Sequence, residues 1–131
     1  MNGGGAVITS VGLRVTHGFE LNCDPTRQPN NLQVNWDGNR FHLELLESAR
    51  CSDNPAIPNA KNALFDTYAG SGSGRYNGAL GARASWTFVD AGEPGRNDTA
   101  QILIRDAAGN TVLNATATLS KGNHQALHEK P

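Results

Sequence analysis

Apolar and polar residues alternate most clearly in the stretch LQVNWDGNRFHLEL, residues 32–45. Asp37-Gly38, at its centre, is a favoured pair for a two-residue type I′ turn, in which both residues take positive φ. A turn at this pair brings the apolar side chains to one face, namely Leu32, Val34, Trp36, Phe41 and Leu43. The polar side chains fall on the other face, namely Asn31, Gln33, Asn35, Arg40, His42 and Glu44. The segment FHLELLESA could also be drawn as a short helix, but the agreement of turn and register favours a half-buried β-hairpin.

A second hairpin is predicted at Asn77-Gly78, which joins DTYAGSGSGRY to ALGARASWTFVD. Unbroken pairing from that turn sets Trp86 opposite Ala69 and turns a row of glycines to the opposite face. Glycine in a strand interior often marks a bulge or the close approach of another group. This row predicts a shallow strip for a sugar ring or an extended peptide, or a strip covered by another part of the chain. The candidate ligand-binding residues are Tyr68, Gly70, Gly72, Gly74, Arg75, Tyr76 and Arg83.

Further strand patterns occur at TAQILIRD, at TVLNATATL, in the ending NHQALH and in the N-terminal run AVITSVGLRVTHGFEL. The pattern therefore predicts an all-β fold, an antiparallel β-sandwich or barrel-like sandwich of about eight short strands. We expect one domain over residues 1–131, with residues 1–5 and 129–131 frayed. The longest irregular segment, residues 52–63, contains two prolines and is predicted to be a surface loop.

Charge and cysteine content narrow the class of protein. The formal net charge of −1 gives no basic surplus for phosphates, which argues against nucleic-acid binding. No apolar run approaches the ~20 residues that a membrane-spanning helix needs. Cys23 and Cys51 each follow a strand-like run and precede polar turn residues, so we expect a disulfide rather than two reduced cysteines. A disulfide implies an oxidising compartment, and we expect a secreted protein whose signal peptide is absent from this sequence.

The polar stretch DAGEPGRND, residues 90–98, has two interpretations. Asp90, Glu93, Asn97 and Asp98 offer oxygen ligands of the kind that calcium prefers, and calcium is the one cofactor that the sequence suggests. The alternative is structural. Asp90 then caps the preceding strand through an Asx turn, Pro94-Gly95 forms a type II turn, and Asp98 begins the next strand by accepting from nearby amides.

Catalytic chemistry has little support in the sequence. His42 with Glu44, and His124 with His128, could build a zinc site only if the two pairs met in space. The run GSGSG does not fit the G-x-S-x-G pattern, and no Gly-Lys-Ser/Thr follows it. We therefore predict no catalytic residues and no enzyme. A small extracellular hydrolase with a triad recognisable only in space is the weaker alternative.

Several longer stretches resemble one known family: HGFELNCD, NNLQVNW, GSGSGRYNG, DAGEPGRNDTAQILI and GNHQAL. They look like the β-rich domain of secreted bacterial proteins that often follows a choice-of-anchor module, the post-COAP domain. The resemblance runs from about Gly3 to the C-terminus and brings no catalytic residues with it. It implies a secreted, accessory, non-catalytic surface module. Together with the candidate ligand strip, we expect a module for binding, adhesion or assembly, with a glycan, peptide or protein ligand. A calcium-stabilised module is one alternative, and a filament whose N-terminal segment adds to a neighbour's sheet edge is another.

Overall fold

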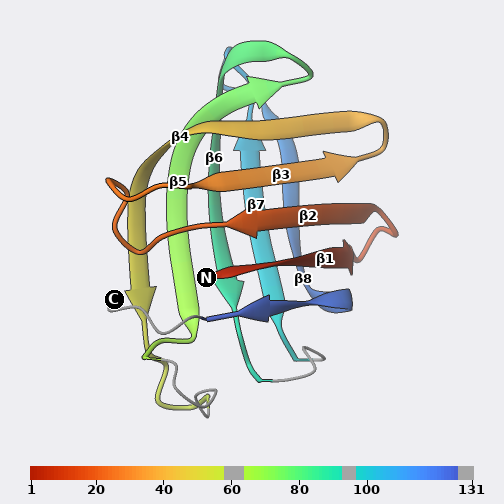
Figure 1. The fold of residues 1–131 in the computed structure, drawn as a ribbon. Helices are drawn as coiled ribbons and strands as arrows, with labels where there is room; N and C mark the ends of the chain where they lie inside the picture. The colour runs from red at the N-terminus through yellow and green to blue at the C-terminus, as the bar shows by residue number, and fades with distance from the viewer. Residues whose placement is uncertain (58–63, 93–96, 127–131) are drawn as a thin grey trace.

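The chain forms a closed antiparallel barrel of eight strands in chain order, each paired with the strands before and after it (Figure 1). The computed structural model describes residues 1–57, 64–92 and 97–126. The strands are β1 (Asn2–Ile8), β2 (Arg14–Glu20), β3 (Asn31–Trp36), β4 (Asn39–Ser52), β5 (Thr67–Tyr76), β6 (Ala79–Val89), β7 (Thr99–Arg105) and β8 (Thr111–Gln125). The predicted all-β antiparallel fold is confirmed, and its architecture is a closed barrel rather than an open sandwich.

The barrel is flattened into two layers whose strands cross at a steep angle (Figure 1). β1, β2 and β3 run across one layer, and β5, β6 and β7 form the other. β4 and β8 are the longest strands, with 14 and 15 residues, and each bends to take part in both layers. The register of β4 against β5 shifts between Leu43 and Leu45 and again between Leu46 and Ser48. Such bulges let a strand turn the corner between two crossed layers.

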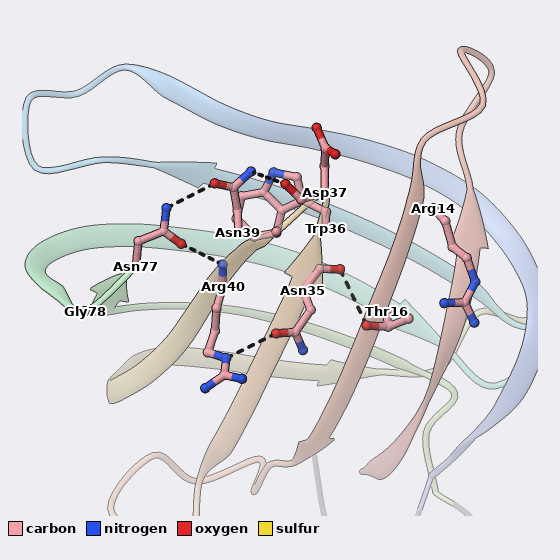
Figure 2. Close-up of a pocket in the computed structure, with 10 residues that line it drawn as sticks. Arg14, Thr16, Asn35, Trp36, Asp37, Asn39, Arg40, Asn77 and Gly78 are labelled. Atoms are coloured by element: carbon pink, nitrogen blue, oxygen red, sulfur yellow. Dashed lines mark hydrogen bonds between the residues drawn. The ribbon is translucent and has the colours of Figure 1, made fainter.

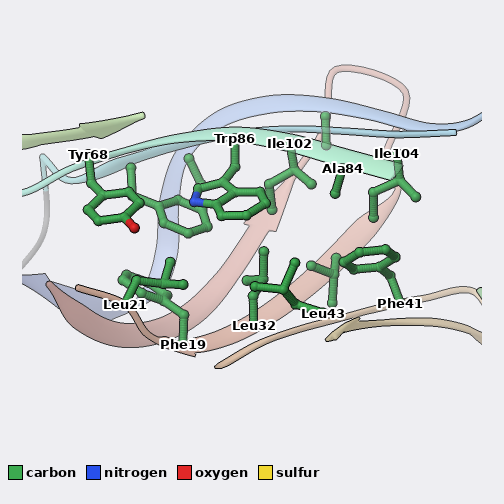
Figure 3. Packing of buried hydrophobic residues seen from close by; sticks show 14 of the residues in the cluster. Phe19, Leu21, Leu32, Phe41, Leu43, Tyr68, Ala84, Trp86, Ile102 and Ile104 are labelled. Carbon is green, nitrogen blue, oxygen red and sulfur yellow. The ribbon is translucent and has the colours of Figure 1, made fainter. Parts of the chain in front are cut away.

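Large apolar side chains from the two layers fill the barrel. Figure 3 shows Tyr68, Trp86 and Ile102 from one layer facing Phe19, Leu21 and Leu32 from the other. Each of these six side chains is at most 7% exposed. A fully buried side chain of this size contributes roughly 1.5–3 kcal/mol through the hydrophobic effect. An eight-stranded barrel is just wide enough for such a filling.

The hairpin at Asp37-Gly38 is confirmed in turn and register. Asp37 and Gly38 have φ of 45° and 78°, and Trp36 pairs with Asn39. The predicted apolar face lies inside the barrel, and the predicted polar face lies outside. The segment FHLELLESA is strand throughout.

The second hairpin has the predicted turn but not the predicted faces. Asn77-Gly78 connects β5 to β6, and Tyr76 pairs with Ala79. Between Gly74 and Tyr76 the register shifts, so Trp86 pairs with Gly70 rather than with Ala69. Because side chains alternate along a strand, this one-residue bulge exchanges the inner and outer faces of β5. The glycine row at 70, 72 and 74 therefore faces the interior, and its prediction as an exposed strip is wrong.

The space at these glycines explains their role. A Cβ added to Gly70 would lie 2.7 Å from the indole ring of Trp86. One added to Gly72 would lie 2.2 Å from the Leu45 carbonyl oxygen, and one added to Gly74 would lie 2.1 Å from that of His42. Glycine thus lets β5 lie close to β4 and leaves room for the Trp86 ring.

The N-terminus is ordered, so the expectation that residues 1–5 fray is wrong. Asn2–Gly5 pair with both β2 and β8, and Met1 is buried with its ammonium group 2.8 Å from the carbonyl oxygen of Leu21. A Cβ on Gly5 would lie 2.1 Å from the Lys121 carbonyl oxygen, so glycine permits this close pairing. Residues 129–131 lie outside the described residues.

The predicted disulfide between Cys23 and Cys51 is confirmed, with the two Cα atoms 5.7 Å apart. It ties the β2–β3 connection to the end of β4. Beside it, the buried Tyr68 donates a 2.8 Å hydrogen bond to the carbonyl oxygen of Asn22. The disulfide and the tyrosine therefore hold the same connection from two sides.

Candidate functional site

The outer face of β2, β3 and β4 carries a band of hydrogen-bonding side chains. The pairing registers put Thr16, Asn35 and Arg40 in one row across the three strands. The next row consists of Gly18, Gln33 and His42. Alternation along each strand turns these residues away from the core, in which Val15, Val34 and Phe41 are fully buried.

Two hollows on this face meet and form what we call the β2–β4 groove. The larger, about 700 Å³, is shown in Figure 2, and its lining includes Arg14, Thr16, Asn35, Asp37, Asn39, Arg40 and Asn77. The smaller, about 520 Å³, lies beside it and is lined by residues such as Gly18, Glu20, Asn31, Gln33 and His42. Thr16 and Asn35 line both hollows, so the two adjoin each other.

Gly18 makes the floor of the smaller hollow low. A Cβ built at Gly18 meets no atom within 4 Å. The missing side chain therefore opens space on the outer face, unlike the glycines of β5, which make room for neighbours inside the barrel. Gly18 lies between Thr16 and Glu20 on the outer face of β2. Because glycine has no side chain, a depression remains there, and a ligand can approach the sheet closely.

Hydrogen bonds fix the polar side chains at the larger hollow. Arg40 donates from Nε to the Asn35 side-chain oxygen at 3.2 Å. Asn77, in the β5–β6 turn, accepts from the Arg40 backbone N–H at 2.8 Å and donates to the Asn39 side-chain oxygen at 3.0 Å. Figure 2 shows Arg40, Asn35 and Thr16 following one another across the strands, with Arg14 beyond Thr16. The turn between β5 and β6, which contains Asn77, thus closes one end of the groove.

The two arginines predicted for the glycine strip, Arg75 and Arg83, instead form ion pairs on the surface. Arg75 forms a 2.8 Å ion pair with Glu44, and Arg83 forms one of the same length with Glu47. Tyr76 is half-buried and stacks on Trp36, with ring centroids 5.9 Å apart. The seven residues predicted as one ligand site are therefore divided between the core and two surface ion pairs.

Asp90 and Asp98 have the structural roles that the alternative interpretation predicted. Asp90 accepts from the backbone N–H of Gly92 at 3.0 Å, which is the expected Asx turn, and from that of Ala126 at 2.8 Å. Asp98 accepts from the N–H groups of Ala91 and His124, both at 2.7 Å. Each carboxylate oxygen thus holds a backbone amide, and together the two aspartates attach the end of β8 to the β6–β7 connection.

The other residues predicted to bind calcium or zinc lie apart or fall outside the described residues. Asn97 is exposed, whereas Glu93, Pro94-Gly95 and His128 lie outside the described residues. His42 and Glu44 are on the outer face of β4, whereas His124 is inside the barrel, so these three side chains do not come together. Within residues 1–57, 64–92 and 97–126, no three His, Cys, Asp or Glu side chains gather in a metal-binding group.

A buried histidine pair lies inside the barrel, with His17 on β2 and His124 on β8, the two strands that flank β1. The Nε2 atoms of His17 and His124 are 2.7 Å apart, and the two side chains are 5% and 0% exposed. His124 Nδ1 lies 3.1 Å from the Val89 carbonyl oxygen, which can only accept, so we assign the His124 proton to Nδ1. His124 Nε2 then accepts from His17 Nε2–H, and both rings are neutral.

Burial dominates the electrostatics of this pair. It lowers the pKa of His17 to about 3, and the neighbouring His124 acts in the same direction. Burial also lowers the pKa of His124 to about 4, although the Val89 carbonyl and Asp90 act in the opposite direction. His17 further packs against Phe19 and Phe88, which leaves little water to solvate an added charge.

Sequence reasoning missed Arg14, Thr16 and Gly18 as site residues and His17 as a core residue. The alternation in RVTHGFE contains the signal, because Val15, His17 and Phe19 fall on one face and Arg14, Thr16 and Gly18 on the other. The alternation does not show that β2 lies beside the polar face of the β3–β4 hairpin.

Comparisons with protein-family models, with curated proteins and with solved structures found no match to this chain. A search of the described residues for a helix long and apolar enough to cross a membrane found none.

Proposed function

We propose that this protein is a secreted, non-catalytic module that binds glycans through the β2–β4 groove. The observation that carries the proposal is the groove itself, in which hydroxyl, amide and guanidinium groups from three strands line two adjoining hollows. Such side chains provide donors and acceptors for sugar hydroxyls. The backbone that positions them is a paired sheet rather than a loop, so little order has to be gained on binding.

The closed barrel favours a glycan over an extended peptide. Extended peptides commonly bind by adding a strand to a free sheet edge. Each of the eight described strands already has a partner on both sides. The same pairing counts against the filament alternative, because β1 would first have to leave both β2 and β8.

A secreted location and a bacterial source belong to the same proposal. The disulfide between Cys23 and Cys51 is of the kind that persists in oxidising compartments. The resemblance to the post-COAP domain agrees with this location and with a surface-binding role, and it remains part of the proposal.

Filling the groove tests the proposed function. Gly18→Tyr puts a β-favouring side chain into the smaller hollow, where an added Cβ meets no atom within 4 Å. Thr116→Tyr is the matched control, because Thr116 is exposed on β8 in the other layer. The disulfide-bonded protein is screened against immobilised neutral and acidic oligosaccharides.

We expect Gly18→Tyr to lose the bound glycans while it keeps the melting temperature of the parent protein. Thr116→Tyr should bind as the parent protein does. Equal binding by parent and Gly18→Tyr, or no binding to any oligosaccharide, would refute the use of this groove.

A further inference from the structure

We infer that the glycan bound in the β2–β4 groove is acidic, with a sugar carboxylate held at the end where Arg14 and Arg40 lie. This inference rests on the proposed function and specifies its ligand. Three features of the groove carry it. They are two arginines that have no ion-pair partner among the described residues, their position on either side of a polar row, and the placement of the nearest described carboxylates.

Arg14 and Arg40, which line the groove, differ from Arg75 and Arg83, which do not. Arg75 and Arg83 are each neutralised by a glutamate at 2.8 Å. Arg14 is exposed and Arg40 bonds through Nε to the neutral amide of Asn35, and neither forms an ion pair within the described part of the chain. No ion pair with a described carboxylate therefore offsets the charge of these two guanidinium groups.

The hydrogen bond from Arg40 also prepares its geometry. Because Nε donates to Asn35, the plane of the Arg40 guanidinium group is oriented, and its terminal nitrogens have no hydrogen-bond acceptor among the described residues. A planar group with two parallel N–H donors matches a carboxylate in a bidentate manner. An arginine oriented in advance loses less side-chain entropy when the ligand binds.

The spacing of the two arginines fits a sugar-sized group. Thr16 and Asn35 lie between them in the cross-strand row, and Arg14 precedes Thr16 by two residues on β2. Strand geometry separates their Cα atoms by about 10 Å across the sheet and about 7 Å along it. Long side chains can close that distance from both sides, so both guanidinium groups can contact a single acidic sugar above Thr16 and Asn35 (Figure 2).

Nearby carboxylates limit the ligand to a moderately acidic one. Figure 2 shows the Asp37 carboxylate pointing away from Arg14 and Arg40, so it does not neutralise them. Glu20 lines the opposite end of the groove, beyond Gly18. A uniformly and densely charged chain would be repelled there, whereas a neutral sugar could donate its hydroxyls to Glu20. The groove therefore favours a uronic acid at the arginine end and an uncharged unit at the Glu20 end.

The test compares glycans that differ only in charge. Short oligosaccharides that join one uronic acid to a neutral sugar are titrated into the disulfide-bonded protein by calorimetry, each against its methyl-esterified form, in which the carboxylate is neutral. We expect the acidic forms to bind at least tenfold more tightly and to weaken as salt is added. Arg14→Gln and Arg40→Gln should each remove most of that preference. Arg105→Gln, an exposed position on β7 in the other layer, should leave it unchanged.

The outcomes separate the two proposals. Equal affinity for acidic and esterified forms, with both lost in Gly18→Tyr, would overturn the acidic ligand and leave the glycan-binding function standing. A preference for sulfated over carboxylated oligosaccharides would also overturn the inference. If no glycan binds, both proposals fail. Acid-selective binding that both arginine variants lose would support the inference.

Discussion

Lowering the pH from 7.5 to 5.0 should cost this protein about 4 kcal/mol of folding free energy, because His17 and His124 are buried without charge. Their pKa values are lowered to about 3 and about 4 in the folded state, whereas an unfolded histidine has a pKa of about 6.5. A group with a lowered folded pKa contributes stability that is complete above the unfolded value. That contribution is lost as the pH falls toward the folded value.

The size of this loss in folding free energy follows from the protonation of the two histidines in the unfolded state. At pH 5.0 the solution is about 1.5 units below the unfolded pKa, so protonation stabilises each unfolded histidine by about 2 kcal/mol, while the folded pair stays neutral. The sum of about 4 kcal/mol holds for any folded pKa well below 5. Near pH 5.5 the unfolded chain binds about 1.8 more protons at these two residues, which gives a slope of about 2.5 kcal/mol per pH unit.

Chemical denaturation at several pH values between 7.5 and 5.0 measures this slope. The double variant His17→Gln with His124→Gln removes both titrating rings, so its slope should fall by most of that amount even if it is less stable overall. His42→Gln is the control, because His42 is exposed on the outer face of β4. A parent protein whose unfolding free energy is flat over this range, or a double variant with the parent's slope, would refute the reasoning.

Three further predictions concern the core, the disulfide and the β6–β7 connection. Gly70→Ala should lower the unfolding free energy by about 1–3 kcal/mol in denaturant, because its Cβ would lie 2.7 Å from the Trp86 ring; a neutral effect would mean that the ring has room to move. Cys23→Ser with Cys51→Ser should cost about 3–4 kcal/mol in the chain-entropy model for a separation of 28 residues, and reduction of the parent protein should cost the same. Asp98→Ala should cost about 3–5 kcal/mol with or without added calcium, since it leaves two backbone N–H groups without their acceptor; a loss that appears only with calcium present would instead indicate an ion site.

The first hairpin could be predicted because two independent local signals agreed. Asp37-Gly38 fixes the turn, and the apolar residues on both sides then fall on one face only in that register. The Asx turn at Asp90 was predictable for a similar reason, since it depends on residues two positions apart. The pairing of the two cysteines needed only that their strand ends be neighbours.

The faces of β5 could not be predicted because glycine and serine provide no hydrophobic contrast. In the sequence GSGSG either set of residues can face the core, so nothing opposes a slip of one residue. The bulge between Gly74 and Tyr76 determines which set of residues faces the core, and the local sequence pattern does not indicate this bulge. Side-chain volume could have indicated the answer, because Trp86 needs an inward neighbour as small as Gly70.

The histidine pair and the groove depend on contacts between distant parts of the chain. His17 and His124 are 107 residues apart, and they meet only because β1 lies between β2 and β8 and closes the barrel. Arg14 and Arg40 share a hollow only because β2 pairs with β3 in one register. Alternation places each residue on a face, but it does not specify which other strand supplies its neighbour.

Two sets of glycines in this barrel have opposite roles, and the difference bears on the proposed function. In β5, inward glycines make room for Trp86 and for close pairing with β4, so the interior is filled by its own side chains. An eight-stranded barrel can hold a small ligand only where such side chains are absent. The glycan recognition that we propose is then left to the outer surface, where it needs a depression among hydrogen-bonding groups. Gly18, facing outward with no atom near its missing side chain, provides that depression beside Thr16 and Gln33.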